Sequence, residues 1–137
     1  MNYLLKEDII PDLQDLIDLY DDAGWVNYTQ NTGRFMNAYK NSLFVLSAWD
    51  GNKLIGIIRV VGDGYSIIYI QDILVRKEYQ HMGVGSKLFT AVMNKYSGVY
   101  QTVLLTDDEP KTKAFYRSMG LVTSDTLGCI SFVKYNQ

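Results

Sequence analysis

The sequence predicts one α/β (α+β) domain over residues 1–137, with a mixed, mostly antiparallel central sheet of roughly six to seven strands and about four flanking helices. Three observations support this prediction. The chain length, 137 residues, suits one domain with one core. Residues 43–75 hold three apolar runs joined by short glycine-containing turns, which is typical of an antiparallel meander. The second half of the chain alternates helical and strand patterns, which adds helices and further strands.

The N-terminal part of the chain predicts a short strand and two helices. Residues 3–6 can form the strand, and the Asp8 side chain can cap the helix that follows. From Leu13 to Tyr20 the apolar residues recur at i, i+3, i+4 and i+7, so this helix has one apolar face. An aromatic and polar stretch without a period predicts a loop, and residues 32–41 predict the second helix.

The remaining chain predicts the sheet and two more helices. The meander strands are expected at residues 43–49, 54–61 and 65–75, with Asp50-Gly51-Asn52 and Gly62-Asp63-Gly64 as turns. A helix at 86–96, a buried strand at 99–105 and a helix at 110–119 are expected to follow. Pro110 suits the start of the last helix and Gly120 suits its end. Residues 122–124 and 130–135 are expected to close the sheet.

Composition and charge narrow the classes of function. Hydrophobic residues make up 47% and charged residues 20% of the chain, as in an ordinary soluble protein. A net charge of −2 argues against nucleic acid as a partner, because phosphate-backbone binding needs a basic surface. No apolar run reaches the roughly 18 residues of a membrane span, and the start of the chain has no secretory pattern. With Cys129 as the single cysteine, we expect a cytoplasmic monomer or homodimer.

The most informative motif is the segment from Gln80 to Lys87 (QHMGVGSK), which lies between a strand-like run and a helix-like run. Glycines at i and i+2 let the backbone approach a large anion, and the first N–H groups of the helix point at that anion. The order Gly85-Ser86-Lys87 does not match a Walker loop, and Leu88 stands where a dinucleotide fingerprint needs glycine. The segment therefore predicts a pyrophosphate cradle of another kind.

Two motifs resemble those of the GCN5-related N-acetyltransferase (GNAT) superfamily. The pattern Gln80-x-x-Gly83-x-Gly85 resembles its coenzyme A loop, Arg/Gln-x-x-Gly-x-Gly/Ala. The segment 112–121 (TKAFYRSMGL) resembles the signature Ala-x-x-Phe/Leu-Tyr-x-x-x-Gly-Phe, with Leu121 in place of Phe and without the Asn often found before this helix. The expected order of elements also matches, so the resemblance covers essentially the whole chain. Within the superfamily the chain looks similar to a bacterial branch related to the plastid arylalkylamine-type acetyltransferases.

The resemblance implies an acetyl-CoA-dependent N-acetyltransferase without a metal. A primary amine, from a small molecule or a protein amino group, would attack the thioester directly in a ternary complex. In this fold the strand before the glycine loop and the strand after its helix splay apart, and the pantetheine arm lies between them. The residues expected at the cofactor are Ile73, Leu74, Val75, Gln80, His81, Met82, Gly83, Val84, Gly85, Ser86, Lys87 and Phe115. A lone histidine and a lone cysteine do not make a set of metal ligands.

Asp72 is the first candidate for a catalytic base. An amine with a pKa of about 10.4 needs roughly 4.6 kcal/mol to lose its proton at pH 7, so a nearby base is useful. Asp72 lies on the strand that the resemblance places beside the acetyl group. A structural carboxylate that accepts backbone or Arg hydrogen bonds is an equal alternative for it. Asp63, for which a turn role is favoured, and Asp107 are weaker candidates.

Tyr116 matches the tyrosine that, in the superfamily, points at the sulfur of coenzyme A. Proton transfer from a phenol to a thiolate is uphill by about 2 kcal/mol in water. We therefore expect Tyr116 to stabilise the developing thiolate by hydrogen bonding. A packing role for Phe115 and Tyr116 in an amphipathic helix is the alternative interpretation.

Acceptor recognition is expected from Trp25, Tyr28, Phe35 and Arg59. Aromatic walls suit an amine on an apolar or aromatic body, through burial and cation–π contact. An equal alternative is that Trp25, Phe35 and Tyr39 seal the end of the domain. A different class of function also stays open, a domain that binds acyl-CoA as a sensor or partner without turnover. An assay of CoA release against a panel of amines distinguishes the two classes.

Overall fold

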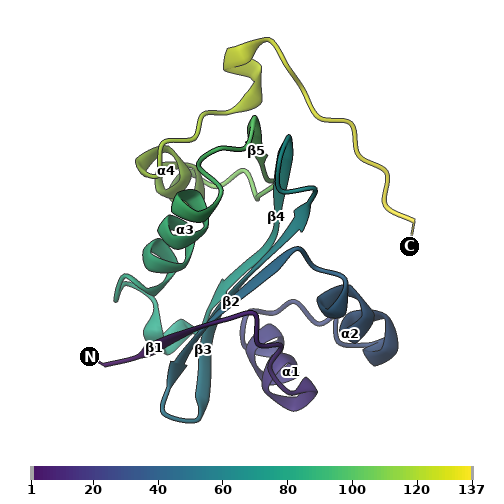
Figure 1. Cartoon of the computed structure of the whole chain (residues 1–137), viewed down its shortest axis with the longest axis vertical. Coiled ribbons are helices and arrows are strands. Elements are labelled where there is room, and N and C mark those ends of the chain that lie inside the picture. The colour runs from purple at the N-terminus through teal and green to yellow at the C-terminus, as the bar shows by residue number, and fades with distance from the viewer. Residues whose placement is uncertain (1, 137) are drawn as a thin grey trace. The chain divides into compact units, whose positions relative to one another are not determined.

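The structure is a computed structural model that describes residues 2–136 and divides the chain into two compact units, Met1–Leu105 and Thr106–Gln137. The first unit contains β1 (Leu4–Glu7), α1 (Leu13–Asp22), α2 (Thr32–Lys40), β2 (Phe44–Asp50), β3 (Lys53–Gly62), β4 (Ile67–Val75), the 3-10 helix η1 (Lys77–Tyr79), α3 (Val84–Lys95) and β5 (Gln101–Val103) (Figure 1). The second unit contains α4 (Pro110–Ser118) and the 3-10 helix η2 (Ser124–Leu127). None of the helices in residues 2–136 combines the length and apolar character that a bilayer span requires.

The sheet has the order β1-β2-β3-β4-β5. Strands β1 to β4 pair antiparallel and β5 pairs parallel to β4, so the predicted mixed, mostly antiparallel sheet is confirmed. Pairing between β4 and β5 covers only Ile67–Tyr69 and Gln101–Val103. From residue 70 to Val75, β4 pairs with β3 alone among the described strands. The expected splay between the strand before the glycine loop and the strand after its helix is therefore confirmed.

The strand count is lower than the predicted six to seven, because the described residues form five strands. Residues 122–124 and 130–135, which were expected to close the sheet, form no strand, and Ser124–Leu127 instead forms η2. Residues such as Ile130 and Phe132 favour extended backbone, but a strand also needs a neighbour with unpaired backbone groups. High β-propensity in one short segment is therefore not sufficient to make a strand.

Two helix starts differ from the predicted ones. Asp8 does not cap α1, because its backbone is left-handed (φ 56°) and its N–H donates to the Val45 carbonyl at 2.9 Å. Pro11 disfavours helical backbone at the residue before it, so α1 begins only after Asp12. Helix α3 begins at Val84 rather than at residue 86, because Gly83 (φ 80°) takes the left-handed conformation that starts the helix.

Helices cover both faces of the sheet in the first unit (Figure 1). One face is covered by α1 and α2, whose inward residues are Leu16, Leu19, Tyr20, Phe35 and Tyr39. The other is covered by α3, whose buried residues are Val84, Leu88, Phe89 and Val92. Gly56 of β3 permits the close approach of α3, since a Cβ atom there would lie 3.1 Å from Val84 Cγ1 and 3.3 Å from Leu88 Cδ1.

A β-bulge in β4 determines where Asp72 points. Arg59 of β3 lies opposite Asp72, but the next residue, Val60, lies opposite Ile70, so Gln71 is inserted. Neighbouring residues of β3 face opposite sides of the sheet. Without the insertion Asp72 and Ile70 would share one face; with it, Asp72 joins Arg59 on the face covered by α1 and α2.

Candidate active site

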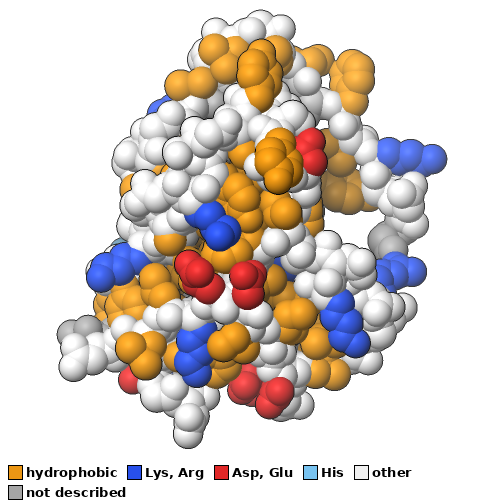
Figure 2. Space-filling view, in the orientation of Figure 1, with side chains coloured by type: hydrophobic (Ala, Val, Ile, Leu, Met, Phe, Trp, Pro, Cys, Tyr) orange, Lys and Arg blue, Asp and Glu red, His pale blue; other side chains and the backbone are white. Residues whose placement is uncertain are grey.

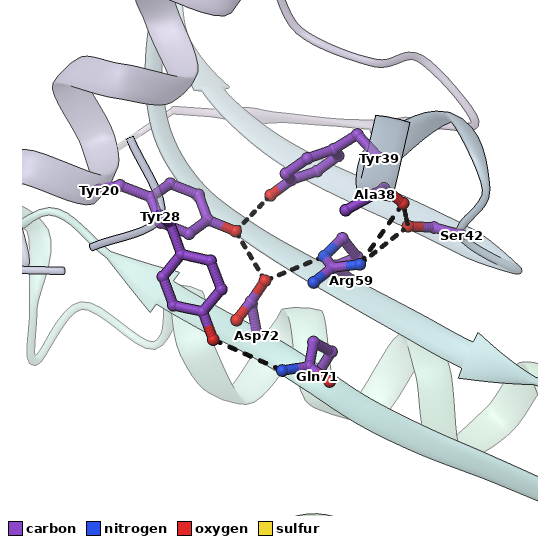
Figure 3. Close-up of polar contacts among 8 residues, drawn as sticks. All are labelled: Tyr20, Tyr28, Ala38, Tyr39, Ser42, Arg59, Gln71 and Asp72. Atoms are coloured by element: carbon purple, nitrogen blue, oxygen red, sulfur yellow. Dashed lines mark hydrogen bonds and ion pairs between the residues drawn. The ribbon is translucent and has the colours of Figure 1, made fainter. Parts of the chain in front are cut away.

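Asp72 lies at the centre of a buried polar cluster formed by four elements of the first unit (Figure 3). Its side chain is fully buried, and Arg59 Nε lies 2.9 Å from Asp72 Oδ2. The Tyr20 hydroxyl of α1 donates to the same oxygen at 2.8 Å. Arg59 Nη1 also lies 3.4 Å from the Ser42 hydroxyl, and the Arg59 guanidinium stands 5.3 Å from the centre of the Tyr39 ring. The cluster therefore joins α1, the end of α2, β3 and β4.

The two tyrosines of this cluster form a directed chain of hydrogen bonds. Burial raises the pKa of both Tyr20 and Tyr39 well above that of an exposed tyrosine, so both hydroxyls keep their protons. The two hydroxyl oxygens are 2.6 Å apart. Tyr20 has one hydroxyl proton, which it donates to Asp72, so the proton between the tyrosines belongs to Tyr39. The order of donation is thus from Tyr39 to Tyr20 to Asp72.

The second carboxylate oxygen, Asp72 Oδ1, is buried and has no hydrogen-bond partner in the described structure. A buried polar atom without a partner costs about 1–3 kcal/mol, and more when it is charged. Both protein donors, Arg59 and Tyr20, bind Oδ2. Oδ2 therefore has the structural role that the sequence left open for Asp72, whereas Oδ1 is buried and has no partner.

The four residues predicted to bind the acceptor fall into two pairs. Phe35 and Arg59 are 3% and 6% exposed, and they pack in the core or pair with Asp72. Trp25 and Tyr28 are 37% and 38% exposed and lie against each other with ring centres 6.0 Å apart. The Tyr28 hydroxyl accepts from Gln71 Nε2 at 3.5 Å, beside Asp72 (Figure 3). Of the four predicted residues, only Trp25 and Tyr28 are exposed, and Tyr28 contacts Gln71, the neighbour of Asp72 in the chain.

Sequence reasoning considered Tyr39 only as an aromatic ring and Tyr20 only as an apolar helix residue, so it missed the hydroxyl groups of both. Tyr20 was placed on the apolar face of its helix, which is correct, since it packs edge-on against Phe35 at 4.9 Å between ring centres. The available signal was the hydroxyl itself. A buried tyrosine needs a hydrogen-bond partner for its O–H group, and two tyrosines near a strand carboxylate could have been combined on that ground.

The glycine loop is open where an anion would approach. Gly83 has no atom within 4 Å of its ideal Cβ position, and as the residue before α3 it has no side chain to cap the helix. At Gly85 a Cβ would make an ordinary contact with Val75 Cγ2 at 3.6 Å. The first N–H groups of a helix lack acceptors within that helix. The loop therefore offers main-chain donors and open space at one helix start.

The end of β4 presents main-chain groups toward its unpaired side. Arg76 N–H donates to the Ile55 carbonyl at 2.8 Å, so by alternation Leu74 also faces β3, and Ile73 and Val75 face away. Gln80 Nε2 reaches back to the Val75 carbonyl at 3.2 Å, which holds the loop against the strand.

The other predicted cofactor residues take different positions around the loop. His81 is exposed and has left-handed backbone (φ 69°), and Met82 is also exposed. Val84 of α3 is buried against Gly56 of β3, so its side chain has a packing role. Lys87 is exposed, with its ammonium group 5.7 Å from the centre of the Tyr3 ring, while Ser86 is half-buried.

Tyr116 and Phe115 belong to the second unit, on α4. Their rings are in edge-to-face contact, with centres 5.1 Å apart. Burial and the nearby Asp107 carboxylate raise the pKa of Tyr116, although an interaction with Thr106 opposes this shift. Tyr116 is therefore neutral at physiological pH and able to donate a hydrogen bond.

Asp63 has the turn role that was favoured for it. Its carboxylate accepts hydrogen bonds from the Ser66 hydroxyl and from the backbone N–H groups of residues 65, 66 and 67. These bonds, that of Ser66 first, lower the pKa of Asp63 far below its usual range. A carboxylate that holds its charge so strongly is a poor proton acceptor.

A family model and several known proteins match this chain. The model of the acetyltransferase (GNAT) domain matches residues 39–122, more than half of the chain, including β4, the glycine loop and α4. This chain belongs to the GNAT family. Similar curated proteins include the uncharacterized ycf52-like N-acetyltransferase of Prochlorococcus marinus, 31% identical over 115 residues, and the uncharacterized N-acetyltransferase ycf52 of Gracilaria tenuistipitata, 27% identical over 129 residues. The matches cover 80% and 90% of this chain, and 62% and 69% of the two relatives.

Solved GNAT structures share the whole fold. A GNAT-family acetyltransferase from Streptococcus pneumoniae is 34% identical, with a TM-score of 0.88 over 99% of both chains. A protein of unknown function from meticillin-resistant Staphylococcus aureus is 26% identical, with a TM-score of 0.79 over 96% of this chain and 100% of the other. An aminoglycoside acetyltransferase from a soil metagenome, solved with sisomicin, is 21% identical with a TM-score of 0.71 over 98% of this chain and 96% of the other, and shows the same GNAT fold.

The charges of this GNAT protein are interspersed rather than gathered. On the face shown in Figure 2, acidic and basic side chains lie among hydrophobic ones without an extended basic patch, in keeping with the net charge of −2. Across residues 2–136, no group of three or more His, Cys, Asp or Glu side chains is arranged to hold a metal ion.

The buried tyrosines predict how stability depends on alkaline pH. Tyr20 and Tyr39 have raised pKa values in the folded state, so the unfolded chain loses these protons first, from about pH 10. Their contribution to stability is complete below that pH and is lost as pH rises toward the folded-state values, by about 1.4 kcal/mol per pH unit for each tyrosine. Urea unfolding between pH 8 and 11 measures this slope. Tyr39→Phe should flatten it, and Tyr100→Phe, at an exposed site, should leave it unchanged; equal slopes in both variants would contradict the prediction.

Proposed function

We propose that this chain is a cytoplasmic N-acetyltransferase, acting as one catalytic domain over residues 1–137, that transfers the acetyl group of acetyl-CoA to a primary amine. The observation that carries this proposal is Asp72 Oδ1, a buried carboxylate oxygen without a partner, on the strand that opens away from β5. Family membership supports the class of reaction. The acceptor is a small-molecule amine or a protein amino group.

The residues present fit acetyl-CoA. The open space at Gly83 and the first N–H groups of α3 suit a diphosphate, which needs donors and the positive end of a helix. The unpaired side of β4, with the main-chain groups of Ile73 and Val75, suits the amide groups of the pantetheine arm, which can bind as an added strand does. When bound, acetyl-CoA supplies a thioester whose carbonyl carbon accepts a nucleophile.

Asp72 acts on the amine. Oδ1 accepts a hydrogen bond from the acceptor's ammonium group and takes one proton from it, which exposes the nitrogen lone pair. The nitrogen then bonds to the acetyl carbon and the carbon–sulfur bond breaks. A second proton leaves the nitrogen and reaches the sulfur, so the products are the acetamide and the thiol of CoA. The proton on Asp72 is finally released to solvent, so protons and charges balance.

Tyr116 acts on the leaving sulfur. Because its raised pKa keeps it neutral, its hydroxyl can donate a hydrogen bond to the negative charge that develops on sulfur. Full proton transfer is not required for this role. The residue is assigned through its match to the family motif on α4.

The half-exposed pair Trp25 and Tyr28 favours acceptors with an apolar or aromatic body. An ammonium group that reaches Asp72 Oδ1 would place the rest of such a molecule beside the Tyr28 ring, against which Trp25 lies, where burial and cation–π contact are favourable. A polyhydroxylated amine gains less from such a surface.

The test is release of CoA from acetyl-CoA with a panel of amines, including arylalkylamines, aliphatic diamines, lysine peptides and an aminoglycoside. We expect turnover with at least one class, highest for amines with an apolar body, and about tenfold lower kcat for Tyr116→Phe. Tyr135→Phe removes the hydroxyl of an exposed tyrosine in the second unit and serves as the control. Tight binding of acetyl-CoA without turnover on any amine would instead favour a non-catalytic acyl-CoA sensor.

A further inference from the structure

We propose that Tyr20 is a positioning residue for Asp72, and that Tyr39 holds Tyr20 in its donating orientation. This inference rests on the proposed function, because it concerns how the acceptor-facing oxygen is presented. Neither tyrosine belongs to the two motifs that define the family resemblance. Both act through Asp72 and not on the acetyl group.

The first step is the unequal use of the two carboxylate oxygens. Tyr20 donates to Oδ2 at 2.8 Å and Arg59 Nε lies 2.9 Å from the same atom, whereas Oδ1 has no partner. Rotation about the Cβ–Cγ bond of Asp72 would turn the plane of its carboxylate. Two donors that converge on one oxygen from different elements oppose this rotation, so the other oxygen keeps one direction.

The second step is the rigidity of the donor. Tyr20 is 0% exposed, and its ring lies edge-on against Phe35 and Tyr39. Its hydroxyl is also the acceptor of the proton that Tyr39 donates across 2.6 Å. Because the Tyr20 oxygen accepts the proton of Tyr39, the Tyr20 proton points to Asp72 and not to another acceptor.

The third step is access. In Figure 3 the Oδ1 atom of Asp72 faces the side on which Tyr28 lies, away from Arg59 and Tyr39. The core tyrosines and Arg59 thus fill one side of the carboxylate, and Oδ1, itself buried, faces the side of the exposed Tyr28, from which the amine would approach. Tyr20 determines the direction of the reactive oxygen without contacting the acceptor.

The test compares kcat and KM for Tyr20→Phe, Tyr39→Phe and wild type, with the best amine and saturating acetyl-CoA. Phenylalanine keeps the ring packing and removes only the hydroxyl. We expect about a tenfold lower kcat for Tyr20→Phe, about threefold lower for Tyr39→Phe, and an unchanged KM for acetyl-CoA. Tyr79→Phe removes another tyrosine–carboxylate hydrogen bond, to Asp50 at 2.6 Å, and should leave kcat unchanged.

A double-variant cycle separates positioning from a general effect on folding. If Tyr20 acts through Asp72, adding Tyr20→Phe to Asp72→Asn should cause no further loss of kcat per acetyl-CoA-binding site. A full tenfold further loss, or wild-type kcat in Tyr20→Phe, would overturn the positioning role while leaving the proposed function intact. If Tyr20→Phe does not fold, Tyr39→Phe carries the same cycle. Absence of turnover in wild type itself would remove both proposals.

Discussion

Asp72→Asn is expected to lower kcat/KM for the amine by about 10²–10⁴-fold, because it removes the proton acceptor at Oδ1. The asparagine side chain has nearly the same size and still offers one oxygen to Tyr20. The affinity for acetyl-CoA should change by less than about twofold, since the glycine loop is untouched. Steady-state kinetics and calorimetric titration of acetyl-CoA measure the two effects.

The same change should also lower stability, which must be measured separately. Arg59 loses its charged partner while its own side chain stays 8% exposed, and breaking a buried pair in this way costs about 3–5 kcal/mol. Urea unfolding gives this value, and activity is normalised to acetyl-CoA-binding sites. Asp63→Asn is the matched carboxylate control, expected to leave kcat/KM unchanged. Wild-type kcat/KM in folded Asp72→Asn would exclude the carboxylate as the base.

Replacing both Gly83 and Gly85 by alanine is expected to raise the Kd for acetyl-CoA by about 100-fold. Each methyl group would occupy space beside main-chain donors that we assign to the diphosphate, at about 1.4 kcal/mol per substitution. Each single variant should raise the Kd for acetyl-CoA by about tenfold, and the two variants should differ in stability. Gly83→Ala forces alanine to φ 80° and should destabilise the fold by roughly 1 kcal/mol.

Gly85→Ala should instead stabilise the fold by about 0.5–1 kcal/mol, because alanine is favoured over glycine in a helix and its Cβ meets only Val75 at an ordinary distance. Gly33→Ala is the matched control, since Gly33 is the second residue of α2 as Gly85 is of α3. It should give a similar gain in stability with an unchanged Kd. If Gly85→Ala gained stability and kept its affinity for acetyl-CoA, the assignment of this loop to the diphosphate would be wrong.

Local patterns in the sequence were sufficient for most of the fold. The apolar runs between Leu43 and Val75, with glycine turns between them, encode the meander because each strand pairs with its neighbour in the chain. The i, i+3, i+4 spacing of α1 encodes its buried face for a similar reason. Errors occurred where a local signal had a stronger local competitor, as when Pro11 displaced the helix start from Asp8.

The closing strands show a different limit. The segment 130–135 has residues that favour extended backbone, yet the described structure contains no strand there. Strand formation depends on pairing with a second segment, and a single-segment pattern cannot show whether that partner is present.

The sequence alone determined the family-like motifs, the glycine loop and the candidate Asp72, because each depends on residues that lie close together in the chain. Only the tertiary structure decided what surrounds Asp72. The Gln71 bulge directs the carboxylate toward α1, where Tyr20, 52 positions away in the chain, and Arg59 bind one of its oxygens and leave the other unpaired. Contacts between distant segments arise from how strands and helices pack, and no short stretch of sequence contains that information.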